Sequence, residues 1–89
     1  MSCYVVAFEV PTDAARQQLT TKLKGFGAYC PVTEHCWAIL SDKSATQIRD
    51  SLTANLPEGS RIFVVRSGTA AAWKNSFGPP NDEWLKKNL

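Results

Sequence analysis

Two residues of this sequence carry side chains suited to metal or phosphodiester chemistry, and each stands at the boundary of an apolar run. Glu9 follows the apolar residues that begin at Cys3, and a carboxylate in this place can bind Mg²⁺ or Mn²⁺ through oxygen. His35 begins a second apolar run, and a histidine side chain can act as a general base near a phosphodiester. If both runs are antiparallel strands, the end of the first lies near the start of the second. Glu9 is therefore a candidate metal ligand, and Glu9 and His35 are candidate catalytic residues.

Each of these residues also has a structural interpretation. Glu9 can be a solvated acid that closes a strand, can pair with Arg66, or can cap the neighbouring turn, and His35 can be a half-exposed histidine at a strand end. Cys30, His35 and Cys36 offer ligand types that zinc prefers, but the spacing C-x4-H-C matches no standard zinc site. Small buried cysteines are the simpler interpretation.

The charge of the chain permits RNA or DNA as a partner without predicting either. Ten basic and eight acidic residues give a formal charge of +2, whereas a dedicated nucleic-acid-binding protein usually has a larger basic excess or a basic stripe. The basic residues are spread along the chain, as on a solvated surface, and pairing of two copies would double them. The candidate nucleic-acid-binding residues are Arg16, Lys22, Lys24, Arg61 and Arg66.

The N-terminal apolar run has no basic leader and is too short for a signal core or a membrane span. We therefore expect a cytoplasmic protein that does not associate with a membrane. The three cysteines show no C-x-x-C spacing, and an odd number of them fits reduced thiols better than a disulfide framework.

The elements that must position Glu9 and His35 alternate in the order β-α-β-β-α-β. The expected strands cover residues 3–10, 28–40 (in two parts, the firmer being 35–40) and 61–66, and the expected helices lie within 12–27 and 41–56. Pro31 separates the two middle strands, and Ser41 and Asp42 are good caps for the second helix. This order predicts an α+β, ferredoxin-like fold, in which two helices cover one face of a four-stranded antiparallel sheet.

Residues 1–66 are predicted to form this domain, and residues 67–89 a C-terminal extension. The first strand is apolar on both faces, but two helices cover only one face of a sheet. The second face would therefore expose an apolar patch of the kind that marks an interface. We expect the extension, a second copy of the chain, or both to cover this patch, and we favour a homodimer.

The extension is expected to break at Gly78-Pro79-Pro80 and then to form a short final helix capped by Asn81 or Asp82. Helices this short do not stand alone in water. The aromatic residues of the extension must therefore dock on another surface, and these are Trp73, Phe77 and Trp84.

Four segments give the chain a resemblance to a known family. They are "HCWAILSDKSA", "SATQIRDSLTANL", "SGTAAAWK" and "EWLKKNL". With these segments the chain resembles the small bacterial proteins labelled SinR-like, which are distinct from the sporulation repressor of the same name. The resemblance covers essentially the whole chain and is densest at residues 35–50 and 67–89.

SinR-like proteins are similar in turn to the CRISPR-associated protein Cas-two and to VapD-type ribonucleases. This similarity implies a homodimer with two sheets packed together, often with the C-terminal segment completing the partner's sheet. It also implies metal-dependent cleavage of RNA or DNA in members whose first strand ends with an aromatic residue and an aspartate. Here the matching pair is Phe8-Glu9, and the longer glutamate displaces the carboxylate. The first helix also lacks the arginine-rich character of those nucleases, so both departures disfavour cleavage.

We expect a Cas-two-like homodimer that serves as a nucleic-acid-contacting scaffold, with nuclease activity lost or unproven. One alternative is a divalent-metal-dependent endonuclease, in which paired Glu9 residues hold Mg²⁺ or Mn²⁺ and His35 or a metal-bound water supplies the base. Another alternative is a dimer that binds only proteins. A bare sheet can also stack bases on aromatic residues, and Phe63 is the candidate for this, whereas Tyr4 and Phe8 suit the core.

Overall fold

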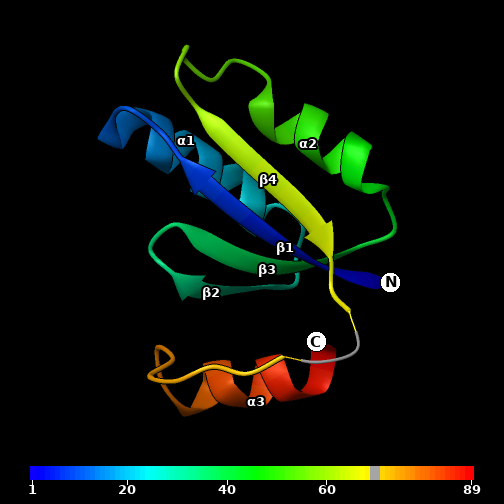
Figure 1. Ribbon diagram of the computed structural model, residues 1–89. Coiled ribbons are helices and arrows are strands. Elements are labelled where there is room, and N and C mark those ends of the chain that lie inside the picture. Colours follow the sequence, from blue (N-terminus) through cyan, green and yellow to red (C-terminus); the bar gives the residue numbers. More distant parts are fainter. Residues whose placement is uncertain (69–70) are drawn as a thin grey trace.

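The computed structural model describes residues 1–68 and 71–89 and shows the element order predicted from the sequence (Figure 1). Thr69 and Ala70, which belong to the predicted extension, lie outside the described residues. The fold is α+β and ferredoxin-like with an added C-terminal helix, which confirms the predicted class. No helix within the described ranges combines the length and apolar character needed to cross a bilayer. The elements are β1 (Ser2–Glu9), α1 (Asp13–Lys24), β2 (Tyr29–Thr33), β3 (Cys36–Ser41), α2 (Ala45–Thr53), β4 (Arg61–Arg66) and α3 (Pro79–Asn88).

Strand β1 lies in the interior of the sheet and positions its two neighbours. The strand order is β2-β3-β1-β4, and every neighbouring pair is antiparallel. The register sets Ala7 opposite both Cys36 of β3 and Phe63 of β4. The carboxyl end of β1 therefore meets the beginnings of β3 and β4.

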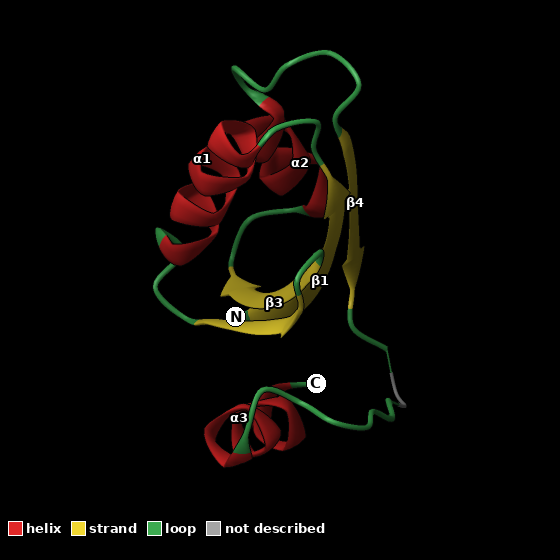
Figure 2. Ribbon diagram, turned by 90° about the vertical axis from the view of Figure 1, so that its left-hand side faces the viewer, coloured by secondary structure: helices red, strands yellow, loops and turns green. Residues whose placement is uncertain are grey.

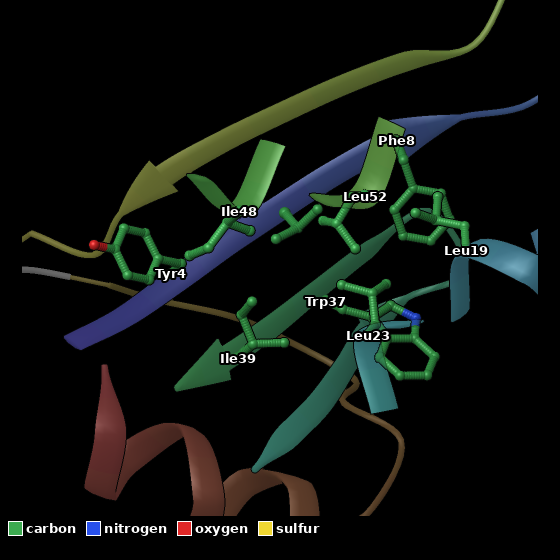
Figure 3. Close-up of a cluster of buried hydrophobic side chains, with 9 residues drawn as sticks. Tyr4, Phe8, Leu19, Leu23, Trp37, Ile39, Ile48 and Leu52 are labelled. Carbon is green, nitrogen blue, oxygen red and sulfur yellow. The ribbon is translucent and has the colours of Figure 1, made fainter. Parts of the chain in front are cut away.

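The main core lies between the sheet and the helices α1 and α2. Its buried members are Tyr4, Val6, Phe8, Leu19, Leu23, Trp37, Ile39, Ile48 and Leu52 (Figure 3). Thr12 caps α1 by accepting a hydrogen bond from the Ala15 N–H, and Ser44 begins α2 in a capping box with Gln47. Both helices thus cover the same face of the sheet, as the sequence predicts.

Helix α3 covers part of the other face of the sheet. It lies on the opposite side of the sheet from α1 and α2 (Figure 2). Leu85, which is 1% exposed, packs there in a second cluster with Cys3 and Cys30. Phe63 and Val65 of β4 lie on the same face but remain 63% and 43% exposed. The extension therefore covers the half of this face near β2 and leaves the half near β4 open.

Three local predictions are wrong, each for a physical reason. Ser41 and Asp42 do not cap α2, because Ser41 still pairs with β1 and the helix begins only after Ser44. Pro79 does not break the extension but starts α3, so Gly78 and not Asn81 or Asp82 is the N-cap, since a proline in the first turn gives up no helical hydrogen bond. Phe77 does not dock on the fold and is 60% exposed.

A polar network holds the extension in shape beside the second cluster. Asp82 Oδ1 accepts hydrogen bonds from Ser76 Oγ at 2.7 Å and Trp73 Nε1 at 2.9 Å. The bond from Ser76 and then that from Trp73 lower the pKa of the Asp82 carboxyl below its ordinary value of 3.8, because both favour the ionised form. Asn81 joins α3 to the edge of the sheet by donating from Nδ2 to the Pro31 carbonyl at 3.0 Å.

Shortening Leu85 tests whether the docking of α3 stabilises the fold. Because the side chain is enclosed, Leu85→Ala should lower the free energy of unfolding by about 2–5 kcal/mol in urea denaturation. Lys87→Ala on the exposed side of the same helix is the control and should change it by less than about 0.5 kcal/mol. Equal stability of Leu85→Ala and the wild type would show that α3 is not docked in solution.

The lowered pKa of Asp82 predicts a pH dependence for the extension. A carboxyl whose pKa is lower in the folded state than in the unfolded state stabilises the fold above its ordinary pKa, and this contribution is lost as the pH falls through the folded value. Acidification should therefore release Trp73, seen as a change in tryptophan fluorescence below the ordinary pKa of Asp82. Asp82→Asn should remove this transition, and a transition that persists in the variant would assign it to another group.

Candidate functional site

The structure places Glu9 and His35 at the same end of the sheet, where His35 lies against Phe8, the residue before Glu9. The Phe8 N–H donates to the His35 carbonyl at 2.8 Å, and the rings of Phe8 and His35 meet edge to face with centroids 6.3 Å apart. His35 lies in the turn before β3 and not within the strand as predicted, because its N–H is bonded to Thr33 Oγ1 at 3.1 Å. The antiparallel pairing of β1 and β3 thus brings the two candidate catalytic residues to the same end of the sheet, and their roles remain predictions.

The two residues border an open pocket of about 360 Å³ at the ends of three strands. The lining residues are Ala7, Phe8, Glu9, His35, Arg61, Ile62 and Phe63. Its polar groups are a carboxylate, an imidazole and a guanidinium, all exposed, and the Phe63 ring beside them is exposed as well. Such a set of groups can bind a phosphate through its donors and a planar ring through its apolar wall.

Glu9 is already paired within the pocket. Arg61 Nη1 donates to Glu9 Oε1 at 3.0 Å, and the two residues lie directly opposite each other on β1 and β4. The Glu9 side chain is 68% exposed and the Arg61 side chain is 79% exposed, so water screens the attraction between them. The alternative pairing of Glu9 with Arg66 is wrong, because the register sets Arg66 opposite Tyr4 at the other end of β4.

The predicted nucleic-acid-binding residues do not gather on one surface of the single chain. Arg61 lines the pocket on the face away from α1 and α2, whereas Arg66 lies at the other end of β4 on the opposite face. Lys24 is exposed at the end of α1.

Two of these basic residues make contacts within the chain. Arg16 Nη2 donates to the Glu34 carbonyl at 3.1 Å, which ties α1 to the turn that carries His35. Lys22 Nζ donates to the carbonyls of Ser51 at 3.2 Å and Ala54 at 2.7 Å, at the carboxyl end of α2 where a cation is favoured by the helix dipole. Arg16 is thus placed toward the pocket end of the sheet, and Lys22 joins the two helices.

The cysteines do not assemble a metal-binding group with His35. Among residues 1–68 and 71–89, no three His, Cys, Asp or Glu side chains come close enough to hold a metal ion. Cys3 and Cys30 are buried under α3, and Cys36 is half-buried. Burial raises the pKa of all three thiols, which keeps them protonated near neutral pH.

Arg61 was not predicted as the partner of Glu9. A usable signal was present, because in the β-α-β-β-α-β order the last strand pairs antiparallel with the first, so the end of one faces the start of the other. Glu9 and Arg61 occupy those two positions. The contributions of Ala7 and Ile62 to the pocket had no comparable signal, since both have the pattern of core residues.

Comparisons with known proteins support the fold and bear on no function. No family model matches the chain, and no curated protein matches it. Among solved structures it is similar to the crystal structure of a hypothetical protein, TT1823, from Thermus thermophilus, with a TM-score of 0.65 and 20% identity. The match covers 84% of this chain and 93% of that chain. At this identity the likeness shows a shared fold alone.

Neutralising Glu9 should leave the protein stably folded. The Glu9–Arg61 pair is exposed, so Glu9→Gln should change the free energy of unfolding by less than about 1 kcal/mol, measured by urea denaturation. A larger loss would mean that the carboxylate supports the sheet end in a way that the pair with Arg61 does not explain. A small change makes this variant usable for tests of function.

Proposed function

We propose that this protein is a homodimer that contacts RNA or DNA and acts as a scaffold, as expected of a Cas-two-like protein of the SinR-like kind. The observation that carries the proposal is the pocket at the end of β1, where Arg61, His35 and Phe63 are exposed together. Guanidinium and imidazole groups can donate to phosphate oxygens, and an exposed ring offers a stacking surface to a base. The pocket therefore combines groups suited to binding the phosphates of a nucleic acid with a ring suited to stacking on a base.

A second copy would supply what one chain lacks for this function. One chain has a formal charge of only +2, and its basic residues lie on several surfaces. Because binding to nucleic acid strengthens with the number of phosphates neutralised, two copies would bind a longer segment more tightly than one. Val65, which is 43% exposed, also gives the chain an apolar surface that a partner can cover.

A divalent-metal-dependent endonuclease is the second candidate, favoured because Glu9 and His35 both line one pocket. Mg²⁺ in such sites is usually held by one or two carboxylates together with substrate phosphates. Among the described residues that line the pocket, Glu9 is the acidic one, and Arg61 already binds it. A single chain thus does not fit a divalent ion, and a second Glu9 from a partner subunit would be required. We therefore favour binding without cleavage.

A dimer that binds only proteins is the third candidate. The low net charge and the exposed apolar side chains of β4 favour it, because protein interfaces bury such side chains. It differs from the first candidate in leaving the pocket without a nucleic-acid ligand.

Titration of labelled single- and double-stranded RNA and DNA tests the proposed function. We expect binding that weakens as salt rises, and we expect Arg61→Ala to reduce affinity about tenfold because a charged donor to phosphate is lost. Arg49→Ala is the matched control, since Arg49 is also exposed and also paired with an acid, Asp50 at 2.8 Å, but lies on α2 outside the pocket. An equal loss of oligonucleotide affinity in the two variants would show that binding depends on the overall charge and not on the pocket.

The same titration with and without Mn²⁺ separates the scaffold from the nuclease. We expect the oligonucleotides to stay intact under both conditions. Cleavage that requires Mn²⁺ and disappears in Glu9→Gln would establish the endonuclease instead. Failure of every oligonucleotide to bind would leave the protein-binding dimer.

A further inference from the structure

The two edges of the sheet differ in how they are protected against pairing with another strand. Strand β2 forms one edge, contains Pro31 without an N–H, and has an irregular register between Pro31 and Thr33. The Asn81 side chain of α3 also donates a hydrogen bond to the Pro31 carbonyl. Proline, irregular pairing and a covering segment are means by which proteins block a sheet edge. The β2 edge is thus protected.

Strand β4 forms the other edge, and within the described residues no strand pairs with its outer side. The Ser67 N–H donates to the Cys3 carbonyl at 2.8 Å, so the alternation of an antiparallel ladder assigns the direction of each residue. By this alternation the backbone N–H and C=O groups of Ile62, Val64 and Arg66 point away from β1. On the helix-facing side of the strand, Val64 is half-buried and borders a pocket that residues of α2 also line.

The side chains of β4 make the middle of this edge apolar. Phe63 is 63% exposed and Val65 is 43% exposed, and the charged residues Arg61 and Arg66 stand only at the strand ends. A charge in the middle of an edge strand would discourage pairing, and β4 has none there. The strand therefore has both free backbone groups and an apolar centre.

We infer that the outer edge of β4 pairs antiparallel with β4 of a second copy of this chain, joining two sheets into one. The inference rests on the proposed homodimer. In a register centred on Phe63 or on Val64, outward backbone groups of the two copies face each other and the sheet faces stay aligned. Neither register sets one arginine opposite another, and both set Phe63 beside an apolar side chain of the partner, either Phe63 or Val65. The strand is therefore complementary to itself.

The length of the strand indicates how tightly such a pair would hold. Strand β4 has six residues and spans roughly 20 Å. Main-chain hydrogen bonds along one strand supply most of the attraction in this mode of binding, and its buried area is below that of a permanent dimer. The pair should therefore form and separate with protein concentration.

Sedimentation analysis from micromolar to millimolar concentration tests the inference on the full chain. Val64→Pro removes an outward N–H without removing a bond to β1, and proline is tolerated on an edge strand. Wild type should dimerise as concentration rises, and both Val64→Pro and Phe63→Lys should weaken association at least about tenfold. Phe77→Lys is the matched control, because Phe77 is 60% exposed but lies outside β4, and it should associate like the wild type.

The variants also distinguish dimerisation through the β4 edge from dimerisation through the open face of the sheet. If Phe63→Lys prevents association but folded Val64→Pro does not, the partner covers the face and the edge inference is overturned while the homodimer stands. A wild type that stays monomeric at millimolar concentration overturns it as well. If Val64→Pro does not fold, hydrogen exchange of the wild type decides, since the Val64 amide must become protected as the dimer forms and an unprotected amide refutes the edge. Oligonucleotide binding is read on the wild type and on Val64→Pro, whose substituted residue lies outside the Glu9 pocket, so failure of the nucleic-acid function and failure of the edge are distinguishable.

Discussion

The pairing of β1 on both of its sides is the constraint on which the rest of the molecule depends. Its eight residues share ladders with β3 and β4, so their backbone groups are satisfied inside the sheet. A strand in this position needs apolar side chains on both faces, and β1 has them in Val6 toward the helices and Cys3 toward α3. The same two ladders fix which residues meet at its end. The core, the need for a C-terminal cover and the location of the pocket therefore follow from one buried strand.

Local patterns predicted the elements and their order, because alternation, helical spacing and caps such as Thr12 act over a few residues. They could not decide between two plausible caps for α2, since Ser41 and Ser44 both suit the role and only the pairing of Ser41 with β1 excludes it. Pro79 was equally ambiguous, because proline is compatible both with a chain break and with the first turn of a helix. Long-range pairing resolves these ambiguities, and it is not visible in short segments.

The candidate site, like the fold, could be predicted only where the order of the strands determines which residues lie close together. Glu9 and His35 could be placed together from the antiparallel order, but the scatter of the basic residues depends on faces and contacts that emerge only in the folded chain, as with Lys22 on the carbonyls of α2. The exposed pair of Glu9 and Arg61 links the two functional interpretations. An incoming phosphate competes with Glu9 for Arg61, whereas an incoming cation competes with Arg61 for Glu9. In the proposed nucleic-acid complex, a phosphate would therefore have to displace Glu9 from Arg61 before it could bind that arginine.

The hydrogen bond from Asn81 to Pro31 bears on how far an assembly of this chain can grow. A sheet with two open edges adds copies at both ends and extends into a fibre, whereas a sheet with one open edge closes after a single addition. In this molecule, helix α3 contacts the β2 edge of the sheet through the hydrogen bond from Asn81 to Pro31. Release of α3 would uncover that edge together with the apolar surface around Leu85. In the edge-paired dimer that we propose, the C-terminal helix would therefore limit further growth of the sheet as well as cover the core.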